Sequence, residues 1–420
     1  MHILKIIHGY PPNYNAGSEV YSQSIVNELK KTNKITVFTR EENDYLLDFK
    51  FRKETKDNIN FVYANMARGK DGYNHKIINR KFAELIAEIK PDIAHVGHLN
   101  HLSTGIVDVL NDEKIPVIFT LHDFWLMCPR GQFLQRNFDG KNLYKLCDKQ
   151  ENLKCANSCY KMYFNDMEGE KYYTSWVKKR MEITKQIIKK VNLFIAPSKY
   201  LMQRFIDDFQ MPKNKIVYLD YGFPTHYLQP VQPKTNGIFT FGYIGTHIPA
   251  KGLNLLINAF SKIKKPAKLK IFGRQNGQNT RALKDMAGKS KNPIEFCGEY
   301  INENLAKVVF NKINCIVVPS IWGENSPLVI HEAQACKVPV ITADFGGMKE
   351  YVNHKVNGLL FEHRNIESLF EQMQFAVENP GKMKTLGQKG YLYSKTEQVP
   401  DIKNHCKQLI NLYNKIKDEK

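Results

Sequence analysis

Short apolar runs rich in β-branched residues alternate along the chain with longer segments whose apolar positions recur at helical spacing. This alternation is typical of parallel sheets that are covered by helices. Each strand is expected to lead into a helix, so the first half of the chain should form one α/β domain. The strands predicted there are HILKII, KITVFT, INFVYA, DIAHVG, PVIFTL, NLFIAPS and IVYLD.

A Pro-rich passage, GFPTHYLQPVQPKTNG at residues 222–237, interrupts this pattern and is interpreted as an interdomain linker. A second series of strands follows, namely IFTFGYIG, KLKIFG, IEFCG, NCIVVPS, PVITA and GLLF. We therefore predict an α/β protein with two Rossmann-like domains, residues 1–222 and 238–395, whose parallel sheets face a central cleft. A last helix within 396–420 follows Pro400 and could cross back onto the first domain. Ligands of such sheets bind at the carboxyl ends of the strands.

Composition agrees with a globular protein of two domains, because the chain has 420 residues, 42% of them hydrophobic and 25% charged. No apolar stretch approaches the length of a membrane span, and the N-terminal run is too short for a signal peptide, so a cytoplasmic protein is expected. The formal net charge of +19 favours an anionic partner. The basic residues are scattered rather than arranged in a stripe, which argues against nucleic acid.

The stretch GENSPLVIHE, residues 323–332, places two carboxylates around a predicted helix start. Ser326 is expected to cap this helix and Pro327 to be its first residue, with the helix running to about Cys336. Glu324 then precedes the helix, and Glu332 lies in its second turn. The backbone N–H groups of Leu328 and Val329 would attract an anion. Carboxylates accept hydrogen bonds from hydroxyls, so the pattern fits a ligand with a phosphate centre and a polyol at each end, such as a nucleotide sugar. A surface helix with two solvated glutamates and an ordinary cap is the alternative interpretation.

Two glycine turns follow other strands of the second series. In GTHIPAKGL, Gly245 allows the backbone to approach an anion closely, and Lys251 can meet that anion with a full charge. In ITADFGGMKEYV, the pair Gly346–Gly347 marks a tight turn near the same edge of the sheet. A solvated lysine and an ordinary turn are the alternative interpretations.

These segments together resemble the donor-binding half of the retaining glycosyltransferases of family 4, which have the GT-B architecture. The resemblance is strongest from Phe239 to Phe361, in VPSIWGENSPLVIHEAQACKVPVITADFGGMKEYVNHKVNGLLF and GYIGTHIPAKGL. It implies that Glu324 contacts hydroxyls of the donor sugar and that Glu332 holds the ribose. Asn325, Ser326, Leu328 and Val329 then belong to the donor site.

One position departs from the family pattern, since many members carry an arginine after the glycine of the phosphate loop, where this chain has Thr246. Binding of the diphosphate would then depend more on Lys251 and on backbone amides. Arg274, after the strand KLKIFG, is a further candidate, with a solvated surface arginine as the alternative.

The first domain offers two candidate positions. Gly17 precedes a helix that Ser18 could cap, and it matches one of two adjacent glycines that in the family approach the donor phosphate and the acceptor. His122 ends the strand PVIFTL and resembles the family histidine that contacts the donor sugar.

A short insertion at about residues 128–160 contains Cys128, Cys147, Cys155 and Cys159. Disulfides are rare in the cytosol, so clustered thiols indicate either a structural zinc site or free buried cysteines. Four protein ligands would leave the metal no open position for substrate.

The segment YYTSWVKKRMEITKQIIKK, residues 172–190, is predicted to be a basic amphipathic helix. Its apolar residues either pack on the sheet or touch an anionic membrane surface. The resemblance implies that such a surface, at the inner face of the membrane, could supply lipid-linked acceptors.

The resemblance implies a retaining transfer of a hexosyl group from a UDP- or GDP-sugar to a glycan or lipid-linked acceptor, as in polysaccharide biosynthesis, without a cofactor in the chemistry. Glu324, His122 and Lys251 would be the catalytic residues, with Lys251 stabilising charge on the leaving diphosphate. An epimerase or phosphorylase on the same fold, or a non-catalytic binding module, remains an alternative. A dinucleotide dehydrogenase is disfavoured, because the first turn lacks the run G-x-G-x-x-G.

Overall fold

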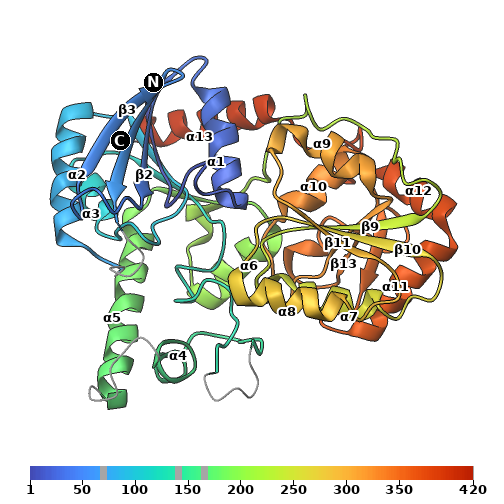
Figure 1. The fold of residues 1–420 in the computed structure, drawn as a ribbon. Helices are drawn as coiled ribbons and strands as arrows, with labels where there is room; N and C mark the ends of the chain where they lie inside the picture. The colour runs from blue at the N-terminus through green and yellow to red at the C-terminus, as the bar shows by residue number, and fades with distance from the viewer. Residues whose placement is uncertain (67–72, 138–143, 162–168, 420) are drawn as a thin grey trace. The chain divides into compact units, whose positions relative to one another are not determined.

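The computed structural model describes residues 1–66, 73–137, 144–161 and 169–419, which fall into two compact units. The first unit consists of Met1–Gly222 together with Ile402–Lys420, and the second consists of Phe223–Asp401. Each unit is an α/β structure built on one sheet that is covered by helices (Figure 1). This agrees with the predicted pair of Rossmann-like domains.

The sheet of the first unit has the strand order β3-β4-β2-β1-β5-β6-β7-β8 and is parallel except at the β3 edge. All seven strands predicted for this half are present. Sequence analysis missed β3, whose sequence FRKETK is largely exposed and pairs only with β4. The strands are β1 (His2–Ile6), β2 (Lys34–Glu41), β3 (Phe51–Lys56), β4 (Ile59–Asn65), β5 (Ile93–Val96), β6 (Val117–Thr120), β7 (Leu193–Ala196) and β8 (Ile216–Tyr218).

Helices connect these strands as expected for crossovers between parallel neighbours. The last helix of the chain also belongs to this unit, and it lies beside α1 (Figure 1). Its buried residues include His405, Leu409, Tyr413 and Ile416, whose spacing puts them on one face. The helices are α1 (Gly17–Leu29), α2 (Lys76–Ile89), α3 (Ile106–Asp112), α4 (Asn152–Cys155), α5 (Gly169–Lys190), α6 (Lys199–Phe209) and α13 (Ile402–Asp418).

The sheet of the second unit has the order β11-β10-β9-β12-β13-β14, and its strand pairs are parallel. All six predicted strands are present. They are β9 (Phe239–Ile244), β10 (Ala267–Phe272), β11 (Ile294–Gly298), β12 (Cys315–Val318), β13 (Val340–Ala343) and β14 (Gly358–Phe361). The helices are α7 (Leu253–Phe260), α8 (Gly277–Ala287), α9 (Leu305–Val308), α10 (Leu328–Ala335), α11 (Ile366–Glu378) and α12 (Pro380–Lys389).

The Pro-rich passage at 222–237 is not a free linker, because nearly all of it belongs to the second unit. The backbone N–H of Val231 donates to the carbonyl of Cys336 (3.1 Å), and that of Lys234 donates to the carbonyl of Asn311 (2.8 Å). These bonds give the extended chain partners for backbone groups that it could not satisfy within itself. The division of the chain into units therefore comes at Gly222 and again near Asp401.

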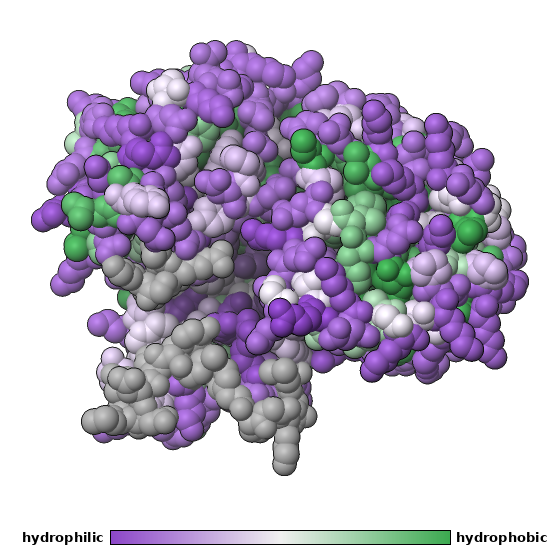
Figure 2. All heavy atoms as spheres, viewed as in Figure 1, coloured by the Kyte–Doolittle hydropathy of each residue, from purple (hydrophilic) through white to green (hydrophobic). Residues whose placement is uncertain are grey.

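The apolar side of α5 is buried inside the first unit. Val177, Met181, Ile187 and Ile188 are all buried, and Trp176 packs against the cluster that contains Val177. Within the described residues, no helix is both long and apolar enough to cross a membrane. Hydrophilic side chains dominate the face of the molecule drawn in Figure 2. Packing on the protein interior therefore accounts for the apolar positions of this helix.

One lysine lies in the core of the first unit without a counter-charge. Lys5 is in the central strand β1 and is 1% exposed, and its Nζ has no hydrogen-bond partner in the described part of the chain. This nitrogen and Nε2 of His122 both lie next to Gly97, since a Cβ added at that glycine would be 3.2 Å from the lysine nitrogen and 3.5 Å from Nε2. Burial lowers the pKa of Lys5 to about 7. An isolated buried ammonium is costly, so this lysine should destabilise the fold at low pH.

We expect Lys5→Met to raise the free energy of unfolding of the first unit by roughly 1 to 3 kcal/mol at or below about pH 7. Between the folded pKa of about 7 and the unfolded pKa of about 10.4, the unfolded chain holds a proton that the folded chain lacks. Wild-type stability therefore rises with pH in this window. The advantage of the variant should shrink as the pH rises, which denaturant titrations at several pH values would measure.

Lys34→Met is the matched control, because Lys34 is an exposed residue of the adjacent strand β2. Its effect on stability should not change over the same pH range. A constant gain for Lys5→Met up to about pH 10 would contradict the assignment of a buried, titrating ammonium.

Candidate functional site

The loop between β12 and α10 carries the first predicted carboxylate of the second unit. Helix α10 begins at Leu328 and ends at Ala335, with Pro327 as its N-cap residue. The predicted cap at Ser326 is wrong, because no side-chain hydrogen bond caps the helix. Pro327 is extended (ψ 117°), and its carbonyl accepts from the N–H of Ile330 (3.0 Å), so the helix starts one residue later than expected. Glu332 lies in the second turn, as predicted.

Glu324 is held by one oxygen of its carboxylate. Oε1 accepts hydrogen bonds from Nζ of Lys251 (2.6 Å), Oγ of Ser320 (2.6 Å) and Nε1 of Trp322 (3.1 Å). The other oxygen, Oε2, has no hydrogen bond from any described residue of the chain. The residue is 6% exposed. Three donors thus fix the carboxylate in place and leave Oε2 able to accept a hydroxyl.

Two glycines allow the backbone around Glu324 to pack this closely. At Gly252, where φ is +69°, a Cβ would lie 1.9 Å from the carbonyl oxygen of Pro319. At Gly347, a Cβ would lie 1.3 Å from the carbonyl oxygen of Asn325. The N–H of Gly347 also donates to the carbonyl of Glu324 (2.7 Å). The predicted Gly346–Gly347 turn therefore supports the carboxylate loop directly, and any larger side chain at Gly347 would displace that loop.

Lys251 ends the loop that follows β9, and this loop is joined to the loops after two neighbouring strands. The N–H of Gly245 donates to the carbonyl of Phe272 (3.1 Å), and the N–H of His247 donates to the carbonyl of Arg274 (3.0 Å). The N–H of Ile321 donates to the carbonyl of Ala250 (3.0 Å), which ties the same loop to the end of β12. Three adjacent strands thus contribute to one edge of the sheet.

The remaining predicted donor residues lie on these loops. Thr246 is half-buried, and its carbonyl accepts from the hydroxyl of Tyr243 (3.2 Å). Arg274 is exposed. Asn325 and Ser326 are buried, at 3% and 5% exposure, so their side chains help to shape the loop before α10. The half-buried Leu328 and Val329 are the first two residues of that helix.

Glu332 has a different environment from Glu324, since its carboxylate makes no hydrogen bond or ion pair with a described residue. Burial raises the pKa of this carboxyl to about 7, and the neighbouring His331 only partly opposes the shift. Its negative charge also raises the pKa values of Tyr227 and Tyr300, on top of the effect of their own burial. The two tyrosines therefore lie close to the carboxylate.

Sequence reasoning missed both tyrosines. Tyr300 comes just after β11, another strand end of this sheet, and this position was the available signal. Tyr227 lies in the passage that was interpreted as a linker, so nothing in the sequence assigned it to a site. Two aromatic rings beside an unpartnered carboxylate form a place where a ribose and a base can bind.

In the first unit, His122 follows β6 and is half-buried. Its Nδ1 is 2.6 Å from the hydroxyl of Tyr221, while Nε2 has no hydrogen-bond partner among the described residues. Burial lowers the pKa of His122 well below its usual value, and the nearby Lys5 lowers it further. The imidazole is therefore neutral near pH 7. One nitrogen of a neutral imidazole donates and the other accepts, so the buried Nε2 has hydrogen-bonding capacity that no described residue uses.

Helix α1 begins at Gly17, with Ala16 as its N-cap residue and no side-chain cap. The predicted cap at Ser18 is wrong, because this hydroxyl donates to the adjacent carboxylate of Glu19 instead (2.8 Å). Glu19 is also 3.3 Å from Nε2 of His8. Burial alone would raise the pKa of Glu19, but His8 and Ser18 lower it to about 2. Sequence analysis missed this carboxylate, although it stands two residues after Gly17.

The four cysteines of the insertion line one small cavity in the first unit. They are Cys128, Cys147, Cys155 and Cys159, and all four are free thiols. In the described part of the chain, no group of three or more His, Cys, Asp or Glu side chains is already arranged to hold a metal ion. The predicted residues thus lie together, although not in a preformed coordination geometry.

Relatives among curated proteins include glycosyltransferases from several organisms. The chain is 25% identical to the capsular polysaccharide biosynthesis glycosyltransferase CapM of Staphylococcus aureus, over 49% of this chain and 58% of that protein. It is 30% identical to a glycosyltransferase of Methanocaldococcus jannaschii, MJ1178, over 48% of this chain and 54% of that protein. These matches span little more than half of each relative. A protein from the cps region of Klebsiella pneumoniae is 24% identical over 83% of this chain and 87% of its own length.

Solved structures share the fold over the whole chain. Sucrose-phosphate synthase from Thermosynechococcus elongatus aligns with a TM-score of 0.73 at 17% identity, covering 100% of both chains. Anabaena HepE in complex with UDP aligns with a TM-score of 0.68 at 16% identity, covering 99% of this chain and 100% of that one.

Two family models match consecutive parts of the chain. The model described as glycosyl transferases group 1 matches residues 229–393, which include the site around Glu324. The model described as glycosyltransferase family 4 matches residues 16–226, half of the chain. With the two α/β units described above, these matches show that the chain belongs to glycosyltransferase family 4, with the GT-B fold.

Proposed function

We propose that the protein transfers a sugar from a nucleotide-sugar donor to an acceptor hydroxyl, with retention of the anomeric configuration. The observation that carries this proposal is the fixed carboxylate of Glu324, paired with Lys251 beside the N-terminus of α10. A carboxylate with a free oxygen suits a sugar hydroxyl, and an ammonium with a helix N-terminus suits a diphosphate. Both requirements of a nucleotide sugar are met within one loop system.

Glu332, Tyr227 and Tyr300 would hold the nucleoside. The ribose hydroxyls can donate hydrogen bonds to the carboxylate of Glu332, which lacks any partner within the described residues. An aromatic ring can stack on the base. Structures of HepE contain UDP or UDP-glucose, so UDP-sugars are the first donors to test, with GDP-sugars next.

In the proposed reaction the acceptor oxygen forms a bond to the anomeric carbon while the bond from that carbon to the diphosphate breaks. The acceptor proton goes to the departing diphosphate on the same face of the sugar, as the family's retaining path implies. Lys251 and the N–H groups of Leu328 and Val329 would stabilise the charge that develops on the diphosphate. No carboxylate of the chain is required as a covalent nucleophile, and no metal ion takes part in this step.

The product is proposed to be a surface polysaccharide or glycoconjugate, which the likeness to CapM and to the Klebsiella protein supports. His122 is proposed to contact the donor sugar, using its free Nε2. A thermal-shift screen of nucleotide sugars would identify the donor. Release of nucleoside diphosphate only when an acceptor is added would distinguish a transferase from an epimerase, and product analysis would separate it from a phosphorylase.

Glu332→Ala should weaken binding of the nucleoside diphosphate by about tenfold to a hundredfold, because a charge-assisted hydrogen bond contributes about 1.5 to 3 kcal/mol.

Since the folded pKa of Glu332 is about 7, the affinity of the wild type should rise between about pH 6 and pH 8 as the carboxylate ionises. Glu332→Gln cannot ionise at this position, so its affinity should not show the increase that comes from ionisation of Glu332. Calorimetry at several pH values is the measurement, and Glu371→Ala, on the exposed side of α11, is the control. Unchanged affinity in Glu332→Ala would rule out the ribose contact.

Glu324→Ala should abolish transfer while leaving free nucleoside diphosphate bound nearly as tightly as in the wild type. The physical reason is that the lost contact is to the sugar, which the free diphosphate lacks. Turnover assays and calorimetry with the nucleoside diphosphate test the two halves of this expectation. An equal loss in both assays would mean that Glu324 acts on the nucleotide instead.

Lys251→Ala should lower kcat by about a hundredfold or more, the scale found when a preorganised electrostatic group is removed. Donor KM should change less. Lys251→Arg keeps the charge but alters its geometry, so partial activity is expected. Steady-state kinetics of the three proteins provide the test. If Lys251→Ala turned over at the wild-type rate, another cation would have to stabilise the leaving diphosphate, and Arg274 would be the first residue to examine.

A further inference from the structure

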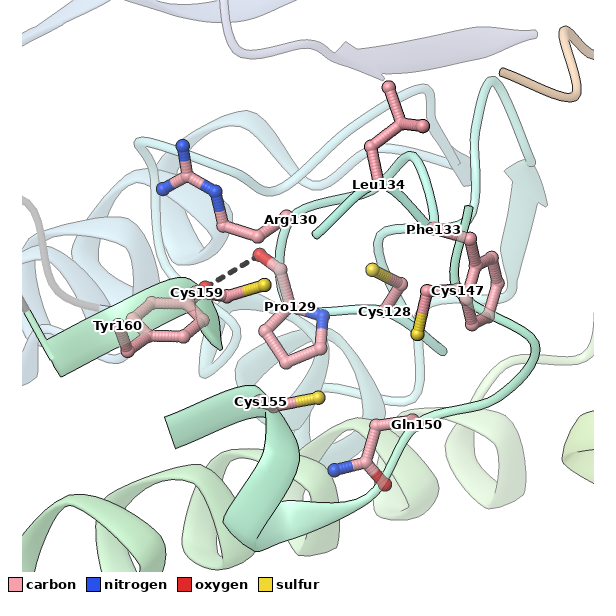
Figure 3. Close-up of a pocket in the computed structure, with 10 residues that line it drawn as sticks. All are labelled: Cys128, Pro129, Arg130, Phe133, Leu134, Cys147, Gln150, Cys155, Cys159 and Tyr160. Carbon is pink, nitrogen blue, oxygen red and sulfur yellow. Dashed lines mark hydrogen bonds between the residues drawn. The ribbon is translucent and has the colours of Figure 1, made fainter. Parts of the chain in front are cut away.

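The cysteine cavity is independent of the proposed donor chemistry, because its lining shares no residue with that site. Three pieces of chain contribute to it: the loop after β6 with Cys128, a second loop with Cys147, and the helical turn Asn152–Tyr160 with the other two thiols. Figure 3 shows the four sulfur atoms directed toward a common region. The cavity has a volume of about 10 Å³, which is room for one water-sized particle.

Local hydrogen bonds hold the backbone on each side of this cavity. The N–H of Cys128 donates to the carbonyl of Phe124 (2.7 Å), and the N–H of Gly131 donates to the carbonyl of Cys128 (2.7 Å), which closes a tight turn. The N–H of Cys147 donates to the carbonyl of Phe133 (2.8 Å). These bonds hold the backbone of Cys128 and Cys147 beside the cavity that their side chains line.

Contacts across the cavity join the turn at Cys128 to the helical turn. The hydroxyl of Tyr160 donates to the carbonyl of Pro129 (2.7 Å), the bond drawn in Figure 3. The N–H groups of Arg136 and Asn137 both donate to the carbonyl of Ser158 (3.2 and 2.9 Å). The three pieces of chain therefore keep their mutual positions.

Cys128, Cys155 and Cys159 are buried and Cys147 is half-buried. Two basic side chains lie near these thiols, since Lys154 interacts with Cys147 and Arg130 lines the cavity.

We propose that Cys128, Cys147, Cys155 and Cys159 together bind one Zn²⁺ ion as four thiolates. Four S–H protons leave to solvent, four S–Zn bonds form, and no oxidant or reductant is needed. Soft sulfur ligands in a tetrahedral set select zinc over harder divalent ions. The resulting net charge of −2 on the centre is offset by Lys154 and by Arg130, which lines the cavity.

Each cysteine can turn its sulfur about one Cα–Cβ bond, so side-chain rotation can direct the four sulfur atoms toward one ion. The ion is structural, because four protein ligands leave no position for substrate. Cys155 also belongs to the apolar cluster with Tyr173, Val177 and Met181 of α5. The zinc would therefore add to the apolar packing that fastens the insertion to this long helix.

The test uses the full chain, purified under reducing conditions without a metal-affinity step. Elemental analysis should find about one Zn per chain, and replacement by Co²⁺ should give the intense sulfur-to-cobalt charge-transfer and d–d bands of a tetrahedral tetrathiolate site. Cys159→Ser should lower the zinc content to near zero or reduce its affinity at least a hundredfold. Cys297→Ser is the matched control, because Cys297 is an exposed free thiol in β11, and this variant should keep its zinc.

If Cys159→Ser does not fold, the wild type still decides the question. A mercurial reagent that modifies thiols should release the bound zinc, with one Zn²⁺ freed for every four thiols modified. A metallochromic dye would measure the released Zn²⁺. Folded, reduced protein that takes up no Zn²⁺ or Co²⁺ would overturn the proposal. So would cobalt bands without charge-transfer intensity, a zinc content unchanged in folded Cys159→Ser, or mass spectrometry showing two disulfides among these cysteines in the native protein.

Discussion

The arrangement of the second unit depends on one carboxylate oxygen, Oε1 of Glu324, which accepts three hydrogen bonds. Its donors come from the loop after β9 and from the segment after β12, so a single atom connects two neighbouring strand ends. The close packing needed for this exists because Gly252 and Gly347 let backbone atoms approach where no Cβ fits. These hydrogen bonds and close backbone contacts together hold the loop that carries Glu324.

Much of the fold follows from the sequence, because parallel strands that are buried on both faces have continuous apolar sequences. Every predicted strand exists, and the exception among observed strands is β3, whose polar sequence reflects an edge position with one neighbour. Helix starts were less predictable. Ser18 and Ser326 have the right residue type for a cap, but the hydroxyl of Ser18 donates to Glu19, and α10 has Pro327 as its N-cap residue and no side-chain cap.

Candidate site residues at strand ends could be named from the sequence, whereas the contacts that join them to distant residues could not. Glu324, Glu332, Lys251 and His122 could be named from motif and position. The ion pair of Lys251 with Glu324 joins residues 73 positions apart, and Tyr227 approaches Glu332 from a passage without secondary structure. Such contacts depend on how loops pack, which local propensity does not encode.

On the proposed function, the ion pair between Lys251 and Glu324 links binding of the diphosphate to binding of the sugar. An incoming diphosphate competes for the ammonium, and if Lys251 turns toward it, Oε1 of Glu324 keeps its bonds to Ser320 and Trp322. The carboxylate then loses its counter-charge at the moment when the donor sugar arrives. On the proposed function, its affinity for a hydroxyl donor would rise for that reason, and recognition of the diphosphate and of the sugar would be coupled through one ion pair. A free sugar should therefore bind more weakly than the same sugar attached to its nucleotide, beyond the loss of the nucleotide's own contacts.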